Sequence, residues 1–255
     1  MTFRTSIIIK TLALGLCGVG MGQNLVTNGD FETIGIAGYS AQIGALPQAP
    51  SPLQTVTGWS TTGYNFLFLP GTGTTTGAKT GFSNQLTFWG SSSQNGGAST
   101  FDFPANSPSG GNFIALDGGY APNTQPLVQT VGGLVTGGDY ELTFYWAAAQ
   151  QKGFNGATTE GMQVTFGGQT FSTSTYNLPS HGFSGWMSAT MNFTATAGSQ
   201  TLSFLAKGTP EGLPPFTLLD GVSVVAVPEA SASAMIMLGM TGLLFVRRRR
   251  SVSCQ

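Results

Sequence analysis

The sequence predicts an all-β protein built as a single antiparallel β-sandwich. Two observations lead to this fold class. Short stretches in which apolar and polar residues alternate follow one another along the chain, and Gly-, Ser- and Asn-rich turns separate them. In addition, no stretch between the two ends of the chain shows the pattern of an amphipathic helix. The ends have a different character and are treated first.

Residues 1–22 have the three parts of a secretory signal peptide. Arg4 and Lys10 form a positive segment, a short apolar stretch follows, and Gly20-Met21-Gly22 offers small residues on either side of a larger one before the cut. The sequence therefore predicts export, with a mature chain that begins at residue 23.

The C-terminal end predicts a transmembrane helix. Residues 230–246 carry no charge, and as a helix they would span roughly 26 Å, which is at the short end of what crosses a bilayer. A buried core helix is the alternative, but such a helix would show a polar face. Four arginines follow the apolar run: Arg247, Arg248, Arg249 and Arg250. A basic cluster of this kind stays in the cytosol and places the rest of the chain outside.

This tail resembles the PEP-CTERM sorting signal of Gram-negative bacteria, which has a Pro-Glu-Pro motif, a transmembrane helix and a basic cluster. Pro228 and Glu229 match the motif, and Ala230 stands in place of its second proline. The resemblance implies a sorting signal over residues 227–250, followed by a short tail at 251–255. It also implies an exosortase, a membrane-embedded transpeptidase, as partner. The protein would be anchored transiently in the inner membrane and then delivered to the cell surface or the extracellular polysaccharide matrix.

The segment between the two ends, residues 23–226, is long enough for one sandwich domain. Cys17 and Cys254 both lie outside it, so the domain has no disulfide. It keeps three lysines, no arginine and nine acidic residues, which gives a net charge of −6. A surface of this kind cannot neutralise phosphates, so the composition excludes nucleic acid as a partner.

In the first half of the domain, strands are predicted at residues 64–69, 99–103, 112–116 and 127–131, with a long hairpin loop at 71–81. In the second half, inward-facing rows are predicted by strict alternation, and a two-residue turn at Gly167-Gly168 suits the positive φ of a tight hairpin. The last strand is expected at 218–225. The inward rows are Tyr140, Leu142, Phe144 and Trp146; Met162, Val164 and Phe166; Met187, Ala189, Met191 and Phe193; and Leu202, Phe204 and Ala206.

The order of several short motifs resembles that of galactose-binding-like jelly rolls, a group that includes carbohydrate-binding modules. The motifs are Asn-Gly-Asp-Phe-Glu at 28–32, Gly58-Trp59, the segments 127–130 and 138–144, and a closing segment at 219–224. In the closing segment, Gly221 replaces the second of two aspartates. The resemblance implies a jelly-roll fold and an extracellular polysaccharide as partner.

The same resemblance implies a structural Ca²⁺ between the first and last strands, at Glu32 and Asp220. Oxygen ligands suit Ca²⁺, and backbone carbonyls can complete its shell. The alternative is that both carboxylates are ordinary turn and strand-end residues. No other cofactor is expected.

Signals for an enzyme are weak. The single histidine, His181, lies in a Ser/Gly loop, and no metalloprotease, esterase or phosphate-loop motif is present. Glycosidase chemistry needs a pair of carboxylates, and nothing in the sequence selects one pair among nine. The sequence therefore predicts a protein that is not an enzyme.

A sugar site uses aromatic faces against the apolar faces of the sugar and amides against its hydroxyls. Most aromatic residues on strands belong to the core, so those in loops or on outward faces are the better candidates. The candidate ligand-binding residues are Trp89, Tyr120, Tyr145, Gln150 and Asn155.

Three functions follow from these observations. The first is an exported surface or matrix protein with a non-catalytic, carbohydrate-interacting sandwich. The second is a purely structural or adhesive surface protein without a small ligand. The third is a secreted polysaccharide-active enzyme. Retention on a polysaccharide separates the first from the second, and release of reducing ends identifies the third.

Overall fold

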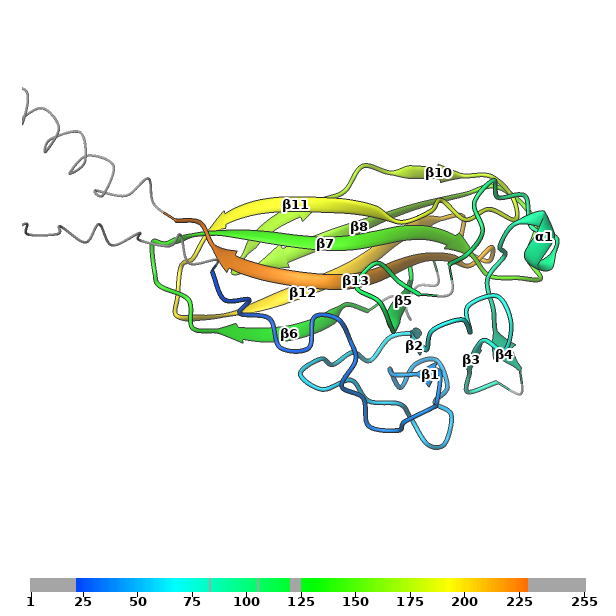
Figure 1. Cartoon of the computed structure of the whole chain (residues 1–255), viewed down its shortest axis with the longest axis horizontal. Coiled ribbons are helices and arrows are strands. Elements are labelled where there is room, and N and C mark those ends of the chain that lie inside the picture. Colours follow the sequence, from blue (N-terminus) through cyan, green and yellow to red (C-terminus); the bar gives the residue numbers. More distant parts are fainter. Residues whose placement is uncertain (1–21, 83, 105, 120–124, 229–255) are drawn as a thin grey trace, which may run out of the picture.

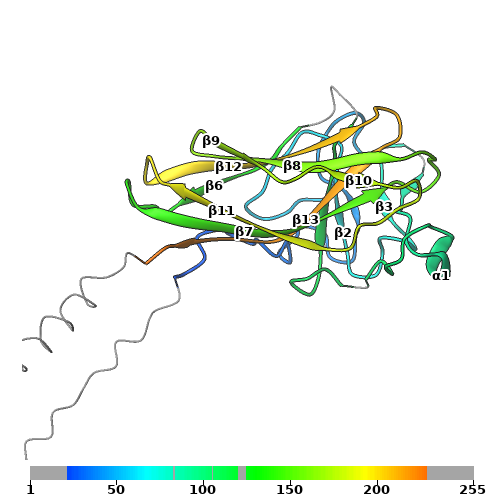
Figure 2. The same cartoon turned by 90° about the horizontal axis from the view of Figure 1, so that it is seen from above.

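The computed structural model describes residues 22–82, 84–104, 106–119 and 125–228. These residues form strands and loops arranged in two facing layers (Figure 1), and Figure 2 shows the layers from the side. The predicted antiparallel jelly-roll sandwich is therefore confirmed. The predicted signal peptide and the tail beyond Pro228 lie outside the described residues, except for Gly22. Within the described part, no helix combines the length and apolar character needed to cross a membrane.

The larger sheet of the described residues has the strand order β11-β7-β13-β5-β2-β1-β3-β4. Its pairs are antiparallel, except for the short contact between β1 and β3. Its strands are β1 (Ala41–Gln42), β2 (Asn65–Phe68), β3 (Ala78–Lys79), β4 (Gln85–Leu86), β5 (Phe113–Asp117), β7 (Asp139–Gln150), β11 (Met187–Thr194) and β13 (Pro215–Ala226).

The smaller sheet has the order β10-β8-β12-β6, and β9 also pairs with β8. Its strands are β6 (Leu127–Gly132), β8 (Thr158–Phe166), β9 (Gln169–Ser172), β10 (Tyr176–Leu178) and β12 (Ser199–Thr209). The single helix of the described residues is one turn, α1 (Ser92–Asn95).

Strands predicted near 64–69, 112–116 and 127–131 are present as β2, β5 and β6, but the prediction at 99–103 is wrong. There the backbone of Phe103 forms its hydrogen bonds with the side chain of Gln94 and not with a neighbouring strand. Its N–H donates to Oε1 of Gln94 at 2.6 Å, and its carbonyl accepts from Nε2 at 2.7 Å. An amide side chain can satisfy both backbone groups of a residue, so no ladder is required.

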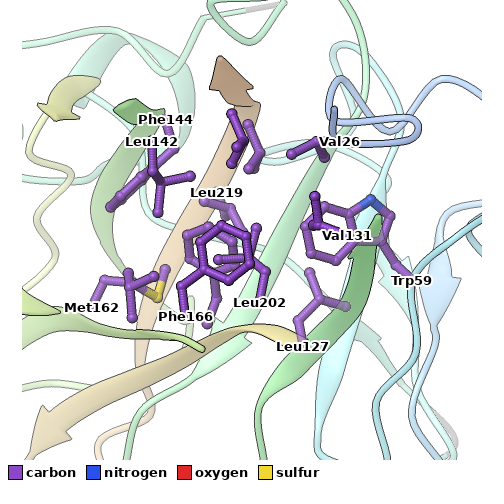
Figure 3. Packing of buried hydrophobic residues seen from close by; sticks show 14 of the residues in the cluster. Val26, Trp59, Leu127, Val131, Leu142, Phe144, Met162, Phe166, Leu202 and Leu219 are labelled. Carbon is purple, nitrogen blue, oxygen red and sulfur yellow. The ribbon is translucent and has the colours of Figure 1, made fainter. Parts of the chain in front are cut away.

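The predicted inward rows meet between the two sheets and form the main core (Figure 3). Leu142 and Phe144 of β7 lie opposite Phe166 and Leu202 of the smaller sheet. Trp59 closes one side of this core, and its indole N–H donates to the carbonyl of Asn28 at 3.0 Å. A buried indole needs such an acceptor. The alternation in the sequence therefore predicted the main core correctly.

A second apolar cluster covers the outer face of the larger sheet, and the alternation did not reveal it. Phe66, Phe68, Phe113 and Phe216 are buried there together with residues of the segment 78–103, which contribute Ala78, Leu86, Phe88 and Phe103. The last part of β7, residues 146–150, is consequently buried on both faces. A strand that is buried on both faces reads as a continuous apolar run and loses its period of two.

The predicted hairpin at Gly167-Gly168 is confirmed. Both residues have positive φ, 54° and 85°, which glycine adopts without strain. A Cβ at Gly167 would also lie 1.5 Å from Nε2 of Gln200. The turn therefore needs glycine for two reasons: the backbone has positive φ, and a side chain at Gly167 would clash with Gln200.

The two ends of the described chain leave the sandwich together. The amide of Leu25 donates to the carbonyl of Val224 at 2.9 Å, and Val227 donates to Asp139 at 2.9 Å. The opposite end of β7 and β13 carries the loops near α1 (Figure 1). Among the described residues, the members of both apolar clusters lie within 26–224. The segment 23–228 thus contains the whole of the described core, and a domain that folds alone needs a core of its own.

Candidate functional site

A cleft of about 260 Å³ opens at the loop end of the sandwich, where β5 and β7 end. The described residues that line it come from six separate segments of the chain. They are Pro47, Tyr64, Phe82, Asn84, Asp117, Gly119, Gln151, Phe154, Gly212 and Pro214. The volume is close to the lower limit of ligand pockets, about 300 Å³. The cleft therefore has the size of a site for one small polar unit.

Aromatic side chains form one wall of the cleft. Phe82 is 48% exposed, which is unusual for a phenylalanine, and Tyr64 is almost fully buried beside it. Their ring centroids are 6.3 Å apart at an interplanar angle of 68°, so the rings meet edge to face. Phe154 contributes a third, half-buried ring. One aromatic face thus stays accessible on a rigid support.

The loop that carries Phe82 is held in place by Thr80. The Thr80 hydroxyl accepts from the amide of Phe82 at 3.1 Å and is within hydrogen-bond distance of the Asn84 carbonyl at 2.9 Å. Threonine commonly stabilises turns through bonds of this kind. The exposed ring is consequently fixed by local hydrogen bonds as well as by packing.

Polar groups face the aromatic wall from the ends of β5 and β7. Asp117 is buried, and its carboxylate accepts from the amide of Gly119 at 3.0 Å. Burial, and next the nearby charge of Asp117, raise the pKa of Tyr64 to about 12. The Tyr64 hydroxyl therefore stays protonated at physiological pH. Asn84 and Gln151 add amide groups, which can both donate and accept.

Three of the predicted ligand residues, Trp89, Gln150 and Asn155, are close together on the other side of the β7–β8 loop. The ring of Trp89 lies 4.2 Å from that of His181, and the Lys152 ammonium is 5.5 Å from the Trp89 centroid. We refer to Trp89, Lys152, Asn155 and His181 as the Trp89 cluster. The indole N–H of Trp89 donates to the carbonyl of Phe154 at 3.2 Å. Through this bond the cluster borders the cleft.

Gln150 has a structural position, because it is fully buried. Its amide donates to the carbonyl of Gly156 at 2.9 Å and accepts from the backbone of His181 at 2.7 Å. It therefore connects two loops and exposes no amide to a ligand. Sequence reasoning missed that burial, because Gln150 directly follows three alanines at the end of a strand that is covered on both faces.

His181, which the sequence presented as an ordinary loop residue, organises the Trp89 cluster. Its φ of 63° is in the left-handed region, and its Nε2 lies 2.5 Å from Oδ1 of Asn155. The asparagine fixes the imidazole against the Trp89 ring. The exposed Asn155 side chain thus has a partner within the protein.

Of the two remaining aromatic candidates, the structure describes only Tyr145, which is separate from this region. Tyr145 is 39% exposed on the outer face of β7 and lies against Gly221 of β13, far along the sheet from the cleft. Tyr120 lies outside the described residues. Sequence reasoning missed Phe82, Tyr64 and Asp117. The Asp-Gly-Gly sequence after a buried strand was the available signal for the last of these.

The predicted calcium residues, Glu32 and Asp220, both bond to the loop at 106–112. The amide of Asn112 donates to Oε1 of Glu32 at 2.6 Å, and the amide of Ser109 donates to Oδ2 of Asp220 at 2.9 Å. Among the described residues, no group of three or more His, Cys, Asp and Glu could hold a metal. A Ca²⁺ ion here would therefore depend on backbone and hydroxyl oxygens as well.

One feature of Asp220 fits a cation. Its Oδ1 is buried and has no hydrogen-bond partner among the described residues. Burial raises the pKa of Asp220, although hydrogen bonds from Ser109, Ser107 and the backbone of Gly221 oppose that shift. A carboxylate oxygen that is both buried and unpartnered is costly, and a bound cation would remove that cost.

No known family model matches the chain, and no curated protein matches its sequence. Among solved structures, the chain is similar to TmCBM61 in complex with beta-1,4-galactotriose, with 13% identity and a TM-score of 0.41; the match covers 80% of this chain and 99% of that one. It is also similar to the CBM22-1 xylan-binding domain of Paenibacillus barcinonensis Xyn10C, with 12% identity, coverage of 82% and 98%, and a TM-score of 0.38. A CBM4 structure is 14% identical to the chain, with a TM-score of 0.34; the match covers 79% of this chain and 99% of that one. Values this low support no inference about ligand or activity.

Proposed function

We propose that this chain is an exported surface or extracellular-matrix protein whose sandwich binds carbohydrate without catalysis, and that it does so at the Phe82 cleft. The observation that carries the proposal is the exposed, well-supported ring of Phe82 opposite the polar groups of Asp117 and Gln151. A sugar ring has an apolar C–H face and a rim of hydroxyls. One accessible aromatic face beside amide and carboxylate groups matches both parts.

The charge of the domain also favours a neutral ligand. The only charged residue among the described lining of the cleft is Asp117. A carboxylate accepts hydrogen bonds from sugar hydroxyls and repels anionic groups. Neutral hexose or pentose units are therefore the ligand class that this cleft suits.

The absence of catalysis is part of the proposal. Hydrolysis of a glycosidic bond uses two carboxyl groups separated by about 5–9.5 Å. Among the described residues that line the cleft, Asp117 is the single carboxylate. In the Trp89 cluster, His181 is bonded to an asparagine amide, which cannot act as an acid or base. These features support binding over bond cleavage.

Export and sorting rest on the sequence. The signal peptide, Pro228-Glu229, the apolar run and the four arginines support secretion, an exosortase partner and transient anchoring in the inner membrane. We also propose Ca²⁺ at Glu32 and Asp220, supported by the unpartnered Oδ1 of Asp220. The calcium would be structural and would supply no chemistry.

Binding to a panel of neutral polysaccharides, including the matrix of the producing cell, tests the function. The purified domain, residues 23–228, is compared with Phe82→Ala. Loss of the ring should weaken retention about tenfold, equivalent to ~1.4 kcal/mol. Phe101→Ala is the matched control, because Phe101 is 55% exposed and is not among the residues that line the cleft.

Equal retention of Phe82→Ala and Phe101→Ala would place the ligand elsewhere. Failure of the unchanged domain to bind any glycan would favour a purely structural or adhesive surface protein. Release of reducing ends from a bound glycan would show that the protein is an enzyme.

A further inference from the structure

Strand β11 forms one margin of the larger sheet, and one of its edges has no neighbouring strand in the described part of the chain. On its other edge, all eight residues pair with β7 in unbroken register, from Met187 opposite Trp146 to Thr194 opposite Asp139. Eight residues correspond to about 27 Å of strand. The strand that carries this edge is therefore long, and its register is regular.

The groups that point to this free edge can be identified. In an antiparallel ladder, the N–H and C=O of alternate residues point together toward one neighbour or the other. The carbonyl of Asp139 accepts from Val227 on the β13 side, and the carbonyl of its partner Thr194 accepts from the side chain of Gln169. The backbone groups of Thr194 are therefore directed away from β7. Because the direction alternates along the strand, the backbone groups of Ser188, Thr190 and Asn192 also point away from β7.

This edge lacks the usual protection of a sheet margin. Natural edge strands are blocked by charged residues, proline or a bulge. The residues of β11 are Met-Ser-Ala-Thr-Met-Asn-Phe-Thr, without a charge or a proline, and the register with β7 shows no shift. A groove of about 620 Å³ runs along the strand, between it and the segment 171–174. Half-buried Met187, Ala189 and Phe171 lie along that groove.

We propose that β11 is a homodimer interface, at which the β11 edges of two copies pair antiparallel around a two-fold axis at Thr190. Thr190 would then lie opposite Thr190 of the second copy, and Ser188 opposite Asn192. This register uses all the free backbone groups of the three residues, in about six hydrogen bonds. The larger sheets of the two copies would continue into one another.

The side chains fit this register. Ser188, Thr190 and Asn192 are exposed on one face, and the pairs Thr–Thr and Ser–Asn place hydroxyls and an amide in contact. Two copies of a domain with a net charge of −6 repel each other over most surfaces. Since β11 contributes no charged residue to the contact, this edge is where the repulsion is small. A second copy is therefore a better occupant than a charged peptide.

Light scattering and sedimentation of residues 23–228 test the proposal. The unchanged domain should form a dimer whose fraction rises with concentration. Thr190→Pro removes one outward N–H that β7 does not use, so the fold should persist while the dimer is lost. Thr190→Lys places two ammonium groups opposite each other and should raise the dissociation constant at least tenfold, as should Thr190→Glu through its carboxylates.

Mixing Thr190→Lys with Thr190→Glu tests the register. The opposite charges meet at the two-fold axis, so the mixture should form a heterodimer that neither variant forms alone. Thr201→Lys is the control, because Thr201 is exposed on β12, which has a paired strand on both sides. A monomeric unchanged domain would overturn the proposal. So would a dimer that persists in Thr190→Pro, or a mixture that stays monomeric.

Discussion

Glu160 should make the sandwich less stable as the pH rises. This residue of β8 is fully buried, and Oε1 of its carboxyl group bonds to the Thr158 hydroxyl. Its Oε2 is buried without a hydrogen-bond partner in the described chain. Burial raises the pKa of Glu160 to about 8, with a smaller opposing effect of Thr158. At neutral pH the folded protein therefore keeps this carboxyl group largely protonated.

The size of the effect follows from the two pKa values. The folded state holds the proton more tightly than the unfolded state, in which the pKa is 4.5. Stability from this group is therefore complete below pH 4.5 and is lost as the pH rises to about 8. At about 1.36 kcal/mol for each pKa unit, the loss is about 3–5 kcal/mol. For a domain of this size that is a decrease in melting temperature of roughly 10 °C.

Substitution Glu160→Gln tests this reasoning, because glutamine has nearly the same shape and stays neutral. We expect the melting temperature of the unchanged domain to fall between pH 5 and pH 8.5 relative to that of Glu160→Gln. Chemical denaturation at both pH values gives the free energies directly. Glu211→Gln makes the same substitution at an exposed carboxyl group and is the control. Parallel pH profiles for the unchanged domain and Glu160→Gln would refute the argument.

Three further outcomes are expected. Calcium should raise the melting temperature of the domain, and Asp220→Asn should abolish that rise. In a chelator the substitution should not destabilise the protein, because it removes a buried charge. A calcium-dependent rise that survives the substitution would exclude this site. Gln150→Ala should cost about 2–3 kcal/mol in denaturant unfolding, because it leaves buried backbone groups of Gly156 and His181 unpaired. Gly167→Ala should destabilise the β8–β9 hairpin by at least about 1 kcal/mol, and an unchanged stability would contradict the packing of Gln200 against the turn.

The sequence predicted the part of the fold in which each strand has one buried face. Rows such as those of β7, β8 and β12 alternate, because one side faces the main core and the other faces solvent. The second cluster lies on the outer face of the larger sheet, so β2 and β5 are buried on both faces and carry no alternation. The non-strand at 99–103 depends on a single side chain, Gln94, that replaces a strand as hydrogen-bond partner. The alternation of apolar and polar residues along the chain shows neither the second cluster nor the role of Gln94.

The candidate site was predictable only in part, for a related reason. Trp89 and Asn155, which the sequence offered only as separate candidates, lie in loops that meet at the end of β7. The cleft itself is built from six segments separated by up to about 170 residues, and only the three-dimensional fold brings Phe82 to Asp117. Exposure distinguishes Phe82 from the buried phenylalanines nearby, and exposure is a property of the folded chain.

The two proposals combine into one consequence for the assembled protein. Antiparallel pairing of β11 also sets the β7 strands of the two copies antiparallel, so their clefts open at opposite ends of the dimer. Gln150 lies seven residues along β7 from Thr143, the partner of Thr190, which places the two clefts about 50 Å apart along the strands. The described chain ends of the two copies also lie at opposite ends of the dimer, which would disfavour pairing while both copies carry the proposed membrane anchor. Dimerisation would then belong to the released protein, where two opposed clefts can hold separate glycan strands.

Such a dimer gains avidity on a polymer and none on a short oligosaccharide. Thr190→Lys should therefore weaken retention on the polysaccharide while leaving the affinity for an oligosaccharide unchanged.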